Sequence, residues 1–274
     1  MGDRWRRTKL RTADWCMAVI PRRVPDKSVL QNCKIISHRG EHDNKRVMEN
    51  TLQAFAIARA AGVWGVECDI RWTADLVPVI CHDPSGERIF GPSETIASLS
   101  FDEVRARMPL IPTLAEVIAE FGGSTHLMLE LKAEPFPQPE RQRRILQETL
   151  SPLVPGRDYH ILGLDPGVFE LVDFIPRRFC CPVAEENVGE LCQHCVECGF
   201  GGLGGHFLLL NHKVKRRLEQ AGQPLGTGFV ASKNCLFREL NRGVEWIFSN
   251  HAVKLQQVRD HYLEGGQPAR ADRR

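Results

Sequence analysis

Residues 34–40 read KIISHRG, a short apolar run that ends in a histidine, an arginine and a glycine. Lys34–His38 is typical of a buried strand, and a helical pattern follows from about Asn50 to the stop signal at Gly62. Strands that alternate with helices are the hallmark of parallel α/β proteins. We therefore take this strand and helix as the first unit of an α/β fold and look for its repetition.

The same alternation continues along most of the chain. It predicts a helix that begins at Thr113 and further strands at Trp64–Ile70, Val77–His82, His126–Lys132, Tyr159–Leu164, Phe179–Val183, Gly226–Ala231 and Trp246–Ser249. Too few residues separate the strands at 64–70 and 77–82 for a crossover helix, and Gly199–Leu210 is too rich in glycine to assign. About eight strands favour one irregular (β/α)8 TIM barrel. A doubly wound open sheet is the alternative, but no Gly-x-Gly-x-x-Gly turn follows the first strand.

The composition is that of an ordinary globular protein. Of 274 residues, 42% are hydrophobic and 26% charged, and the formal net charge is +2, so no strong overall field marks a nucleic-acid binder. We expect an N-terminal extension over 1–30, a barrel over 31–262 and a flexible basic tail over 263–274. Basic residues gather at the two ends, and we interpret them as solvated termini: Arg4, Arg6, Arg7, Lys9, Arg11, Arg270, Arg273 and Arg274.

No apolar run approaches the roughly 18 residues needed to cross a bilayer. The stretch Ala13–Ile20 is short, contains Asp14 and lacks a small-residue cleavage site, so we do not expect a signal peptide. Ten cysteines without such a signal indicate reduced thiols in a cytoplasmic protein.

Charged and titratable residues gather at the ends of the first four predicted strands. Residues two apart on a strand point to the same side, so Glu67 and Asp69 share a face, as do Glu130 and Lys132. In a parallel barrel, active sites are built at the carboxyl ends of the strands. The groups that we expect to meet there are His38-Arg39-Gly40, Glu67-x-Asp69, His82-Asp83 and Glu130-x-Lys132.

These residue types favour metal-assisted phosphate chemistry. Three carboxylates that converge inside a barrel repel one another unless a cation lies between them, and oxygen ligands suit a hard ion such as Mg²⁺ or Ca²⁺. Two histidines that titrate near neutral pH can serve as general acid and base. Arginine and lysine are suited to bind the non-bridging oxygens of a phosphate.

The order of these motifs resembles the glycerophosphodiester phosphodiesterase family over roughly residues 34–133. The resemblance also includes Glu49-Asn50-Thr51 and residues 111–117 (IPTLAEV). It implies an irregular barrel of the type found in phosphoinositide-cleaving phospholipases and hydrolysis of glycerophosphodiesters to glycerol 3-phosphate and an alcohol. By position, it implies metal ligands at Glu67, Asp69 and Glu130, a catalytic acid–base pair in His38 and His82, and phosphate contacts from Arg39 and Lys132.

The chain departs from the usual pattern of that family beyond Lys132. Gly163-Leu164 stands in place of Ser-Phe, residues 227–230 (TGFV) in place of Trp-Thr-Val-Asn, and Phe248-Ser249-Asn250 where Thr-Asp is usual. Earlier in the chain, Asp75-Leu76 replaces Asp-Gly, and residues 41–48 are unusually polar. These departures leave the predicted metal and phosphate chemistry intact and concern the pocket for the alcohol groups.

Two other functions stay open at this point. A lysophospholipase D acting on lipid-like diesters would need an apolar funnel at the barrel mouth. A non-catalytic barrel that only binds phosphodiesters would have lost a histidine or a carboxylate, and all five are present. A nucleic-acid phosphodiesterase is disfavoured because no basic stripe with interleaved aromatic residues is evident.

A cysteine cluster lies outside the resemblance. Cys192, Cys195 and Cys198 are spaced as in zinc or iron–sulfur sites, but this spacing also places them in successive turns of a predicted helix. Because cysteine packs well as a small apolar residue, we expect packing rather than metal binding. We likewise interpret His206 and His212 as structural.

Overall fold

Residues 17–266 are described by a computed structural model of the chain, in which eight parallel strands close into a barrel. The strands are β1 (Lys34–His38), β2 (Gly65–Trp72), β4 (His126–Leu131), β5 (Tyr159–Gly163), β6 (Cys180–Ala184), β7 (Leu203–His206), β8 (Leu225–Gly228) and β9 (Trp246–Ser249). Each strand pairs with its neighbours, and β1 pairs with both β9 and β2, which closes the ring. The expected TIM barrel is confirmed, and the open sheet is wrong.

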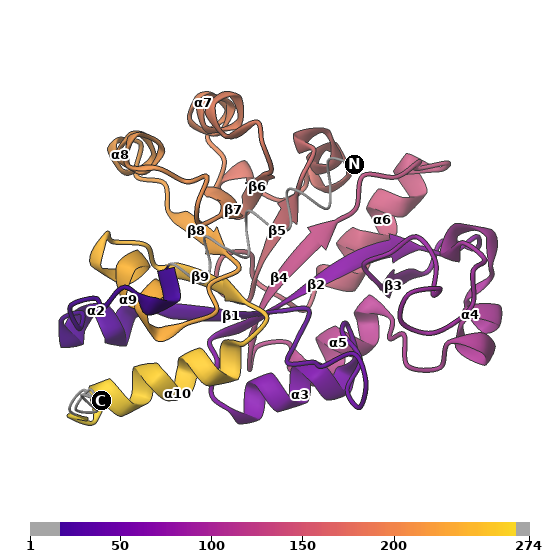
Figure 1. Ribbon diagram of the computed structural model, residues 1–274. Helices are drawn as coiled ribbons and strands as arrows, with labels where there is room; N and C mark the ends of the chain where they lie inside the picture. Colours follow the sequence, from indigo (N-terminus) through magenta and orange to yellow (C-terminus); the bar gives the residue numbers. More distant parts are fainter. Residues whose placement is uncertain (1–16, 267–274) are drawn as a thin grey trace, which may run out of the picture.

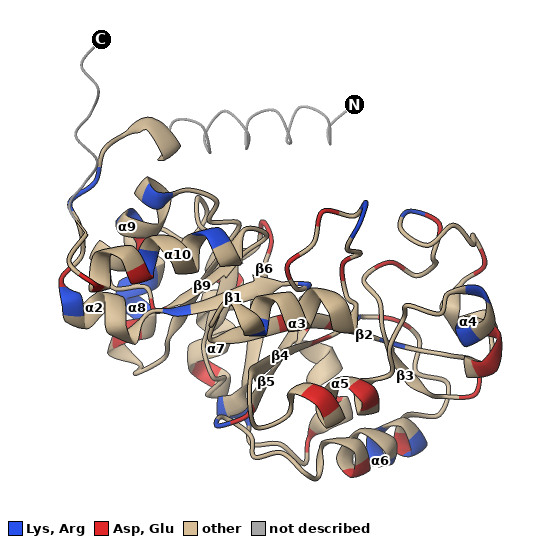
Figure 2. Cartoon of the chain, turned by 90° about the horizontal axis from the view of Figure 1, so that it is seen from below, with Lys and Arg blue, Asp and Glu red and all other residues tan. Residues whose placement is uncertain are grey.

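Helices surround the ring and cover its outer face (Figure 1). The α-helices are α2 (Lys27–Asn32), α3 (Leu52–Ala60), α4 (Phe101–Arg107), α5 (Leu114–Phe121), α6 (Pro139–Leu150), α7 (Val188–Cys198), α8 (His212–Gln220), α9 (Lys233–Asn241) and α10 (Ala252–Leu263), and short 3-10 helices occupy Ile96–Ser98, Pro166–Val172 and Arg177–Phe179. The main core fills the layer between strands and helices. Most charges lie on the helices and loops (Figure 2).

Local sequence explains where the first helices begin. The side chain of Thr51 accepts a hydrogen bond from the amide of Ala54 and caps α3. Thr113 and Glu116 form a complete capping box at the start of α5, as the predicted helix start at Thr113 requires. The cap at Thr51 fixes the entry into α3 directly after the segment that carries His38 and Arg39.

The third predicted strand lies outside the ring. β3 (Pro78–Ile80) runs antiparallel to β2 and pairs with its far end, at Ile70, Arg71 and Trp72. The expectation that His82 follows a parallel barrel strand is therefore wrong. Because β2 extends beyond the ring, β3 returns alongside it, and the amide of Cys81 donates to the carbonyl of Asp69. His82 still reaches the site by this return.

The segment after β3 has a small core of its own, separate from the main one. Its buried residues are Val79, Cys81, Ile96, Leu99, Val104, Met108 and Ile111. The glycine-rich segment left unassigned contains β7, which supplies the eighth strand of the ring.

The predicted segments at the chain ends are only partly described. The basic residues at positions 4–11 and 270–274 lie outside residues 17–266, and so does Asp14. Residues 27–32 form α2, which packs against α9 and α10. Within the described residues, no helix is both long and apolar enough to span a bilayer.

Candidate active site

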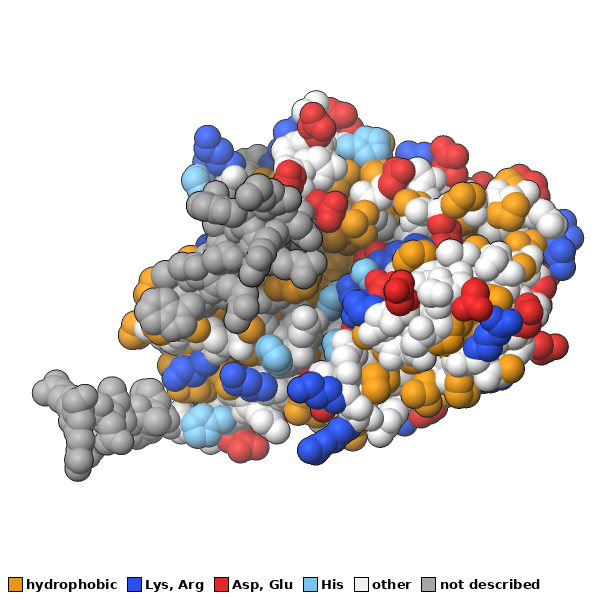
Figure 3. All heavy atoms as spheres, turned by 45° about the vertical axis from the view of Figure 1, so that its right-hand side comes forward, with side chains coloured by type: hydrophobic (Ala, Val, Ile, Leu, Met, Phe, Trp, Pro, Cys, Tyr) orange, Lys and Arg blue, Asp and Glu red, His pale blue; other side chains and the backbone are white. Residues whose placement is uncertain are grey.

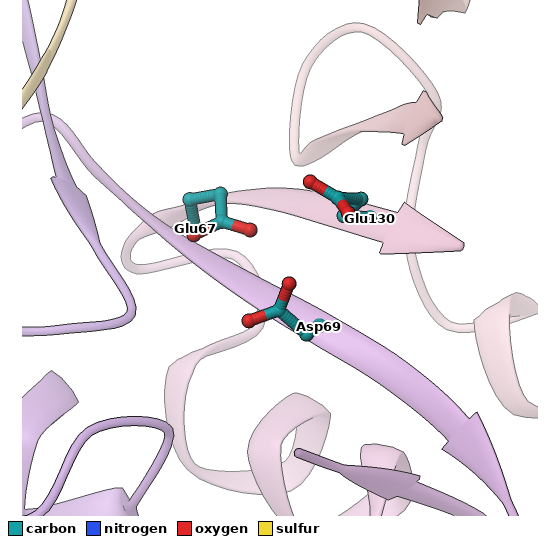
Figure 4. Close-up of side chains that lie close together, drawn as sticks. All are labelled: Glu67, Asp69 and Glu130. Atoms are coloured by element: carbon teal, nitrogen blue, oxygen red, sulfur yellow. The ribbon is translucent and has the colours of Figure 1, made fainter. Parts of the chain in front are cut away.

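Strand register brings three carboxylates together inside the barrel. Glu67 lies opposite His38 on β1, and Asp69 lies opposite Glu130 on β4. Because Glu67 and Asp69 are two apart on β2, both point to the interior. Ligand oxygens of the three acids lie within 4.8 Å of one another, and all three residues are buried (Figure 4). The sequence-predicted metal ligands therefore form one group.

Charge repulsion inside this group is strong. Burial, with the neighbouring charges of Asp69 and Glu130, raises the pKa of Glu67 well above its usual value. Burial also raises the pKa of Glu130. Burial opposes ionisation of Asp69 as well, but Lys132 and Arg39 hold the pKa of Asp69 below its usual value. The site thus holds more carboxylate than its own cations neutralise.

Arg39 and Lys132, the predicted phosphate contacts, lie against these acids. Lys132 Nζ is 2.5 Å from Asp69 Oδ1 and also contacts Glu130. The backbone amide of Arg39 donates to Glu67 Oε2 at 3.1 Å, and its Nε lies 3.5 Å from Asp69 Oδ2. The ion pairs orient both cations toward the same cavity as the carboxylates.

The three acids fit a hard divalent cation. Glu67 Oε1 is buried without a hydrogen-bond partner, which is costly for a polar atom unless something binds it. The donor atoms are all carboxylate oxygens, the ligands that Mg²⁺ and Ca²⁺ prefer. Among residues 17–266, no other group of three or more His, Cys, Asp and Glu ligand atoms lies as close. These residues could hold a metal ion.

His38 ends β1 beside this group. Its Nδ1 lies 2.6 Å from Asn250 Oδ1, and its Nε2 lies 3.8 Å from Glu67 Oε2. The ring meets Phe229 edge-on at 5.5 Å between centroids. Burial and the nearby Arg39 lower the pKa of His38 to about 4. His38 is therefore neutral near pH 7, with its orientation fixed by an amide.

His82 has a carboxylate partner instead. Its Nδ1 lies 2.6 Å from Asp83 Oδ1, and Asp83 Oδ2 accepts from Arg88 at 2.5 Å. Arg88 donates further to both oxygens of Glu49, and Glu49 also accepts from Arg39 at 3.0 Å. A continuous polar network thus connects His82 to Arg39.

The residues Glu49-Asn50-Thr51 support the site from behind. Asn50 donates from Nδ2 to Asp69 Oδ2 at 2.7 Å, and its amide donates to the carbonyl of Arg39. Arg39 and Asn50 both have left-handed backbones, with φ of 58° and 57°. Such conformations in residues other than glycine cost free energy and gather at functional sites. Gly40 is required, because a Cβ there would lie 2.7 Å from the Cβ of Ala54.

Glu67, Glu130 and both histidines border one cavity of about 550 Å³, visible as a hollow with hydrophobic side chains beside charged ones in Figure 3. Most of its polar lining comes from the first half of the barrel: His38, Arg39, Glu67, His82, Glu130 and Lys132, while Glu185, Glu186 and His206 line it from the second half. Every sequence-predicted site residue except Asp69, which lies behind Lys132, lines this cavity. Asp83 was expected at the site through the pair His82-Asp83, although no role was assigned to it. Asn250 and Arg88 were not predicted, because they meet their partners only in the folded chain.

The cysteine cluster lies elsewhere, on α7. Cys192 and Cys195 are buried in the main core, and Cys195 Sγ lies 3.6 Å from the carbonyl oxygen of Gly202. Cys198 is partly exposed beside His194. The sulfurs therefore have different surroundings.

Comparisons with known proteins agree with this geometry. A family model described as the glycerophosphoryl diester phosphodiesterase family matches residues 38–154. Glycerophosphodiester phosphodiesterase 1 of Rattus norvegicus is 37% identical over 117 residues, which cover 35% of this chain and 34% of the relative. The Bos taurus protein of the same name is 29% identical over 146 residues, covering 46% and 43%. The match thus spans less than half the length of these relatives.

Solved structures resemble a larger part of the chain. A glycerophosphodiester phosphodiesterase from Thermotoga maritima has a TM-score of 0.69 at 19% identity and covers 82% of this chain and 98% of its own. A phosphodiesterase of Oleispira antarctica, in complex with the product sn-glycerol-3-phosphate, has a TM-score of 0.70 at 20% identity, with 83% and 96% covered. At this identity the likeness establishes the fold.

Proposed function

Because residues 38–154 match the model of the glycerophosphoryl diester phosphodiesterase family, we propose that the chain hydrolyses glycerophosphodiesters to glycerol 3-phosphate and an alcohol. The observation that carries the proposal is the convergence of three buried carboxylates within 4.8 Å, beside a cavity that two of them and two histidines line. A binding protein without activity would not need two histidines with separate polar partners. The substrate is a small molecule.

In this proposal Glu67, Asp69 and Glu130 hold one divalent cation, Mg²⁺ or Ca²⁺. When bound, the ion withdraws charge from the phosphate and so lowers the barrier to attack. Arg39 and Lys132 bind the non-bridging phosphate oxygens, and their ion pairs hold them in place before the substrate arrives.

The two histidines divide the proton transfers according to their partners. The amide oxygen of Asn250 can only accept, so His38 Nδ1 carries a proton and Nε2 is free to take one from the attacking hydroxyl. Burial lowers the pKa of His82, and the hydrogen bond to Asp83 opposes this shift, so Asp83 favours the protonated ring that can protonate the leaving alkoxide. His38 is thus the general base and His82 the general acid.

A substrate panel tests the proposal. We expect purified protein to release the alcohol from glycerophosphocholine, glycerophosphoethanolamine or glycerophosphoinositol when Mg²⁺ or Ca²⁺ is present. Excess chelator should abolish the release, and added ion should restore it. Full activity in excess chelator would remove the metal from the proposal, and no release from any diester would remove the activity.

A further inference from the structure

The second half of the barrel lines the same cavity with apolar groups. Its wall is formed by side chains on β5, β6 and β9 and on the loops between the later strands: Leu162, Leu164, Val183, Leu209, Phe229 and Phe248. This wall faces the polar lining formed by residues 38–132. Glu185, Glu186 and His206 also line the cavity from this half, beside the apolar wall. The polar lining of residues 38–132 is suited to a phosphate, and the apolar wall to hydrocarbon.

The apolar side continues downward into the barrel. Leu162, Cys181 and Trp246 border the cavity and also belong to a buried cluster with Ile36 and Met128 that fills the barrel interior. The floor of the cavity is thus apolar.

Glycines on β7 and β8 leave space inside the cavity. β7 and β8 read LGGH and LGTG, and Gly204, Gly205 and Gly228 line the cavity. A Cβ at Gly204 would lie 3.3 Å from Val183, beside the apolar wall. Larger side chains at these positions would take up space that a ligand can use.

The mouth of the cavity carries apolar side chains as well, beside the exposed Glu185 and Glu186. Leu164 and Phe229 both line it and are 39% and 48% exposed. Phe229 has a left-handed backbone, with φ of 65°, and its ring contacts that of His38. An exposed aromatic residue held in a strained conformation beside a catalytic group indicates a contact with ligand.

We propose that the preferred substrates are phosphodiesters that carry an apolar chain, of the lysophospholipid class. This inference rests on the proposed function. The phosphate binds at the polar lining, and the hydrocarbon chain of the substrate lies along Leu162, Val183 and Phe248. Water adds across the phosphorus–oxygen bond to the head group, the proton passes to the leaving alkoxide, and the phosphomonoester keeps the chain. A substrate without a hydrocarbon chain leaves the apolar wall exposed to water, so the free energy of burying that wall is not gained.

Chain length provides the direct test. We would compare choline release from glycerophosphocholine and from its butanoyl, hexanoyl and octanoyl esters, all below their micelle concentrations. Each fully buried methylene is worth about fourfold in binding, so kcat/KM should rise by about 15-fold for every two methylenes. A kcat/KM that stays flat along the series would overturn the inference.

Variants test whether the hydrocarbon chain of the substrate lies along the apolar wall. Val183→Asp puts a charge into the apolar wall and should lower the ratio of octanoyl to deacylated kcat/KM by about tenfold or more. Leu164→Ser, at the exposed rim, should lower it less and does not endanger folding. Leu110→Ser is the matched control, because Leu110 is 54% exposed and lies outside the cavity lining. An unchanged ratio in both Val183→Asp and Leu164→Ser, with folding verified by circular dichroism, would contradict the inference.

Binding separates this inference from the proposed function. Titration of wild-type protein with hexyl-, octyl- and decylphosphocholine in chelator should show affinity rising with chain length, with or without turnover. If glycerophosphocholine is hydrolysed but affinity does not depend on the chain, only the inference fails. If affinity depends on the chain but no diester is cleaved, only the proposed function fails.

Discussion

The two halves of the barrel have the same architecture but line the cavity with opposite chemistry. From β1 to β4 the chain contributes two histidines, two carboxylates and two cations to the cavity, whereas from β5 to β9 it contributes mainly aliphatic and aromatic side chains. The family match covers residues 38–154 and so includes the first set but not the second. Reaction and recognition are thus assigned to separate parts of the chain, and each half can be changed with a different expected result.

The largest effect is expected from Glu67→Gln in the polar half. Losing one of three carboxylates should lower kcat/KM by about 10³-fold and abolish the rise in Tm that Mg²⁺ or Ca²⁺ produces in the wild type. Without ion, the variant should melt no lower than the wild type, because burial and the charges of Asp69 and Glu130 disfavour ionised Glu67.

Glu185→Gln is the matched control from the other half, since Glu185 lines the cavity after β6. It should keep the response of Tm to the ion. If thermal melting showed the ion response intact in Glu67→Gln, the division between the halves would be wrong.

Loss of His38 and loss of His82 should have different effects on activity, depending on the leaving group of the substrate. His38→Ala and His82→Ala should each lower turnover of glycerophosphocholine by about 10²-fold or more. On a p-nitrophenyl diester, whose leaving group needs no proton, the His82→Ala loss should shrink to about tenfold or less, while the His38→Ala loss persists. Equal losses on both substrates would contradict the assignment of His82 as the acid.

The stability of the fold should depend on pH through two histidines at the boundary between the two halves of the barrel. His126, on β4, holds its Nε2 2.8 Å from His160 Nδ1, on β5, and its own Nδ1 lies 3.0 Å from the carbonyl oxygen of Arg157. The carbonyl oxygen of Arg157 can only accept a hydrogen bond, so neutral His126 donates from Nδ1 and accepts at Nε2 from His160. Protonation of His126 at Nε2 removes this acceptor and breaks the hydrogen bond to His160. Burial lowers the pKa of His126 to about 3 and that of His160 to about 4.

Both folded pKa values lie below the unfolded value of about 6.5, so the unfolded chain binds more protons between about pH 6.5 and 4. This contribution to stability is present above pH 6.5 and is lost as the pH falls. Each histidine contributes about 2 kcal/mol, so urea unfolding should show a loss of about 4 kcal/mol between pH 7 and pH 5. His160→Asn keeps an N–H donor but cannot titrate, and it should remove about half of that dependence. An unaltered pH profile in His160→Asn would exclude the pair as its cause.

The smallest effect is expected in the apolar half, from Cys195→Ala. If Cys195 only packs on α7, the variant should lose about 1–2 kcal/mol of unfolding free energy or less and keep its turnover. Elemental analysis of protein purified without chelator checks the alternative. One zinc per chain that disappears in Cys195→Ala would establish a metal site on α7.

The fold was predictable from local pattern except where pairing overrides it. β1, β4 and β9 follow clear apolar runs, and their predicted bounds agree with the structure to within a residue. β7 was missed because two of its four residues are glycines, which have low strand propensity, and its pairing with β6 and β8 decides its conformation. β3 has the apolar pattern of a strand, but such a pattern does not show whether a strand runs parallel or antiparallel to its neighbour.

The site was predictable where its residues share a strand or a short motif. Glu67-x-Asp69 and Glu130-x-Lys132 point inward because strand geometry requires it. The partners of the histidines depend on distant contacts: Asn250 is 212 residues from His38 along the chain. The apolar wall could not be predicted, because buried strand residues look the same in sequence whether they face a cavity or the core.

The separate small core around β3 has a consequence for how the molecule opens. Its seven buried residues connect to the ring mainly through the end of β2, so this part can unfold as a local cooperative unit while the barrel stays closed. Cys81 belongs to it, and His82, Asp83 and Arg88 follow directly. Amide hydrogens from Val79 to Ile111 should therefore exchange with solvent sooner than those of β2 and β4. Mild denaturant should then abolish the proposed activity before the barrel melts, because the segment that carries His82 unfolds while the carboxylates stay in place.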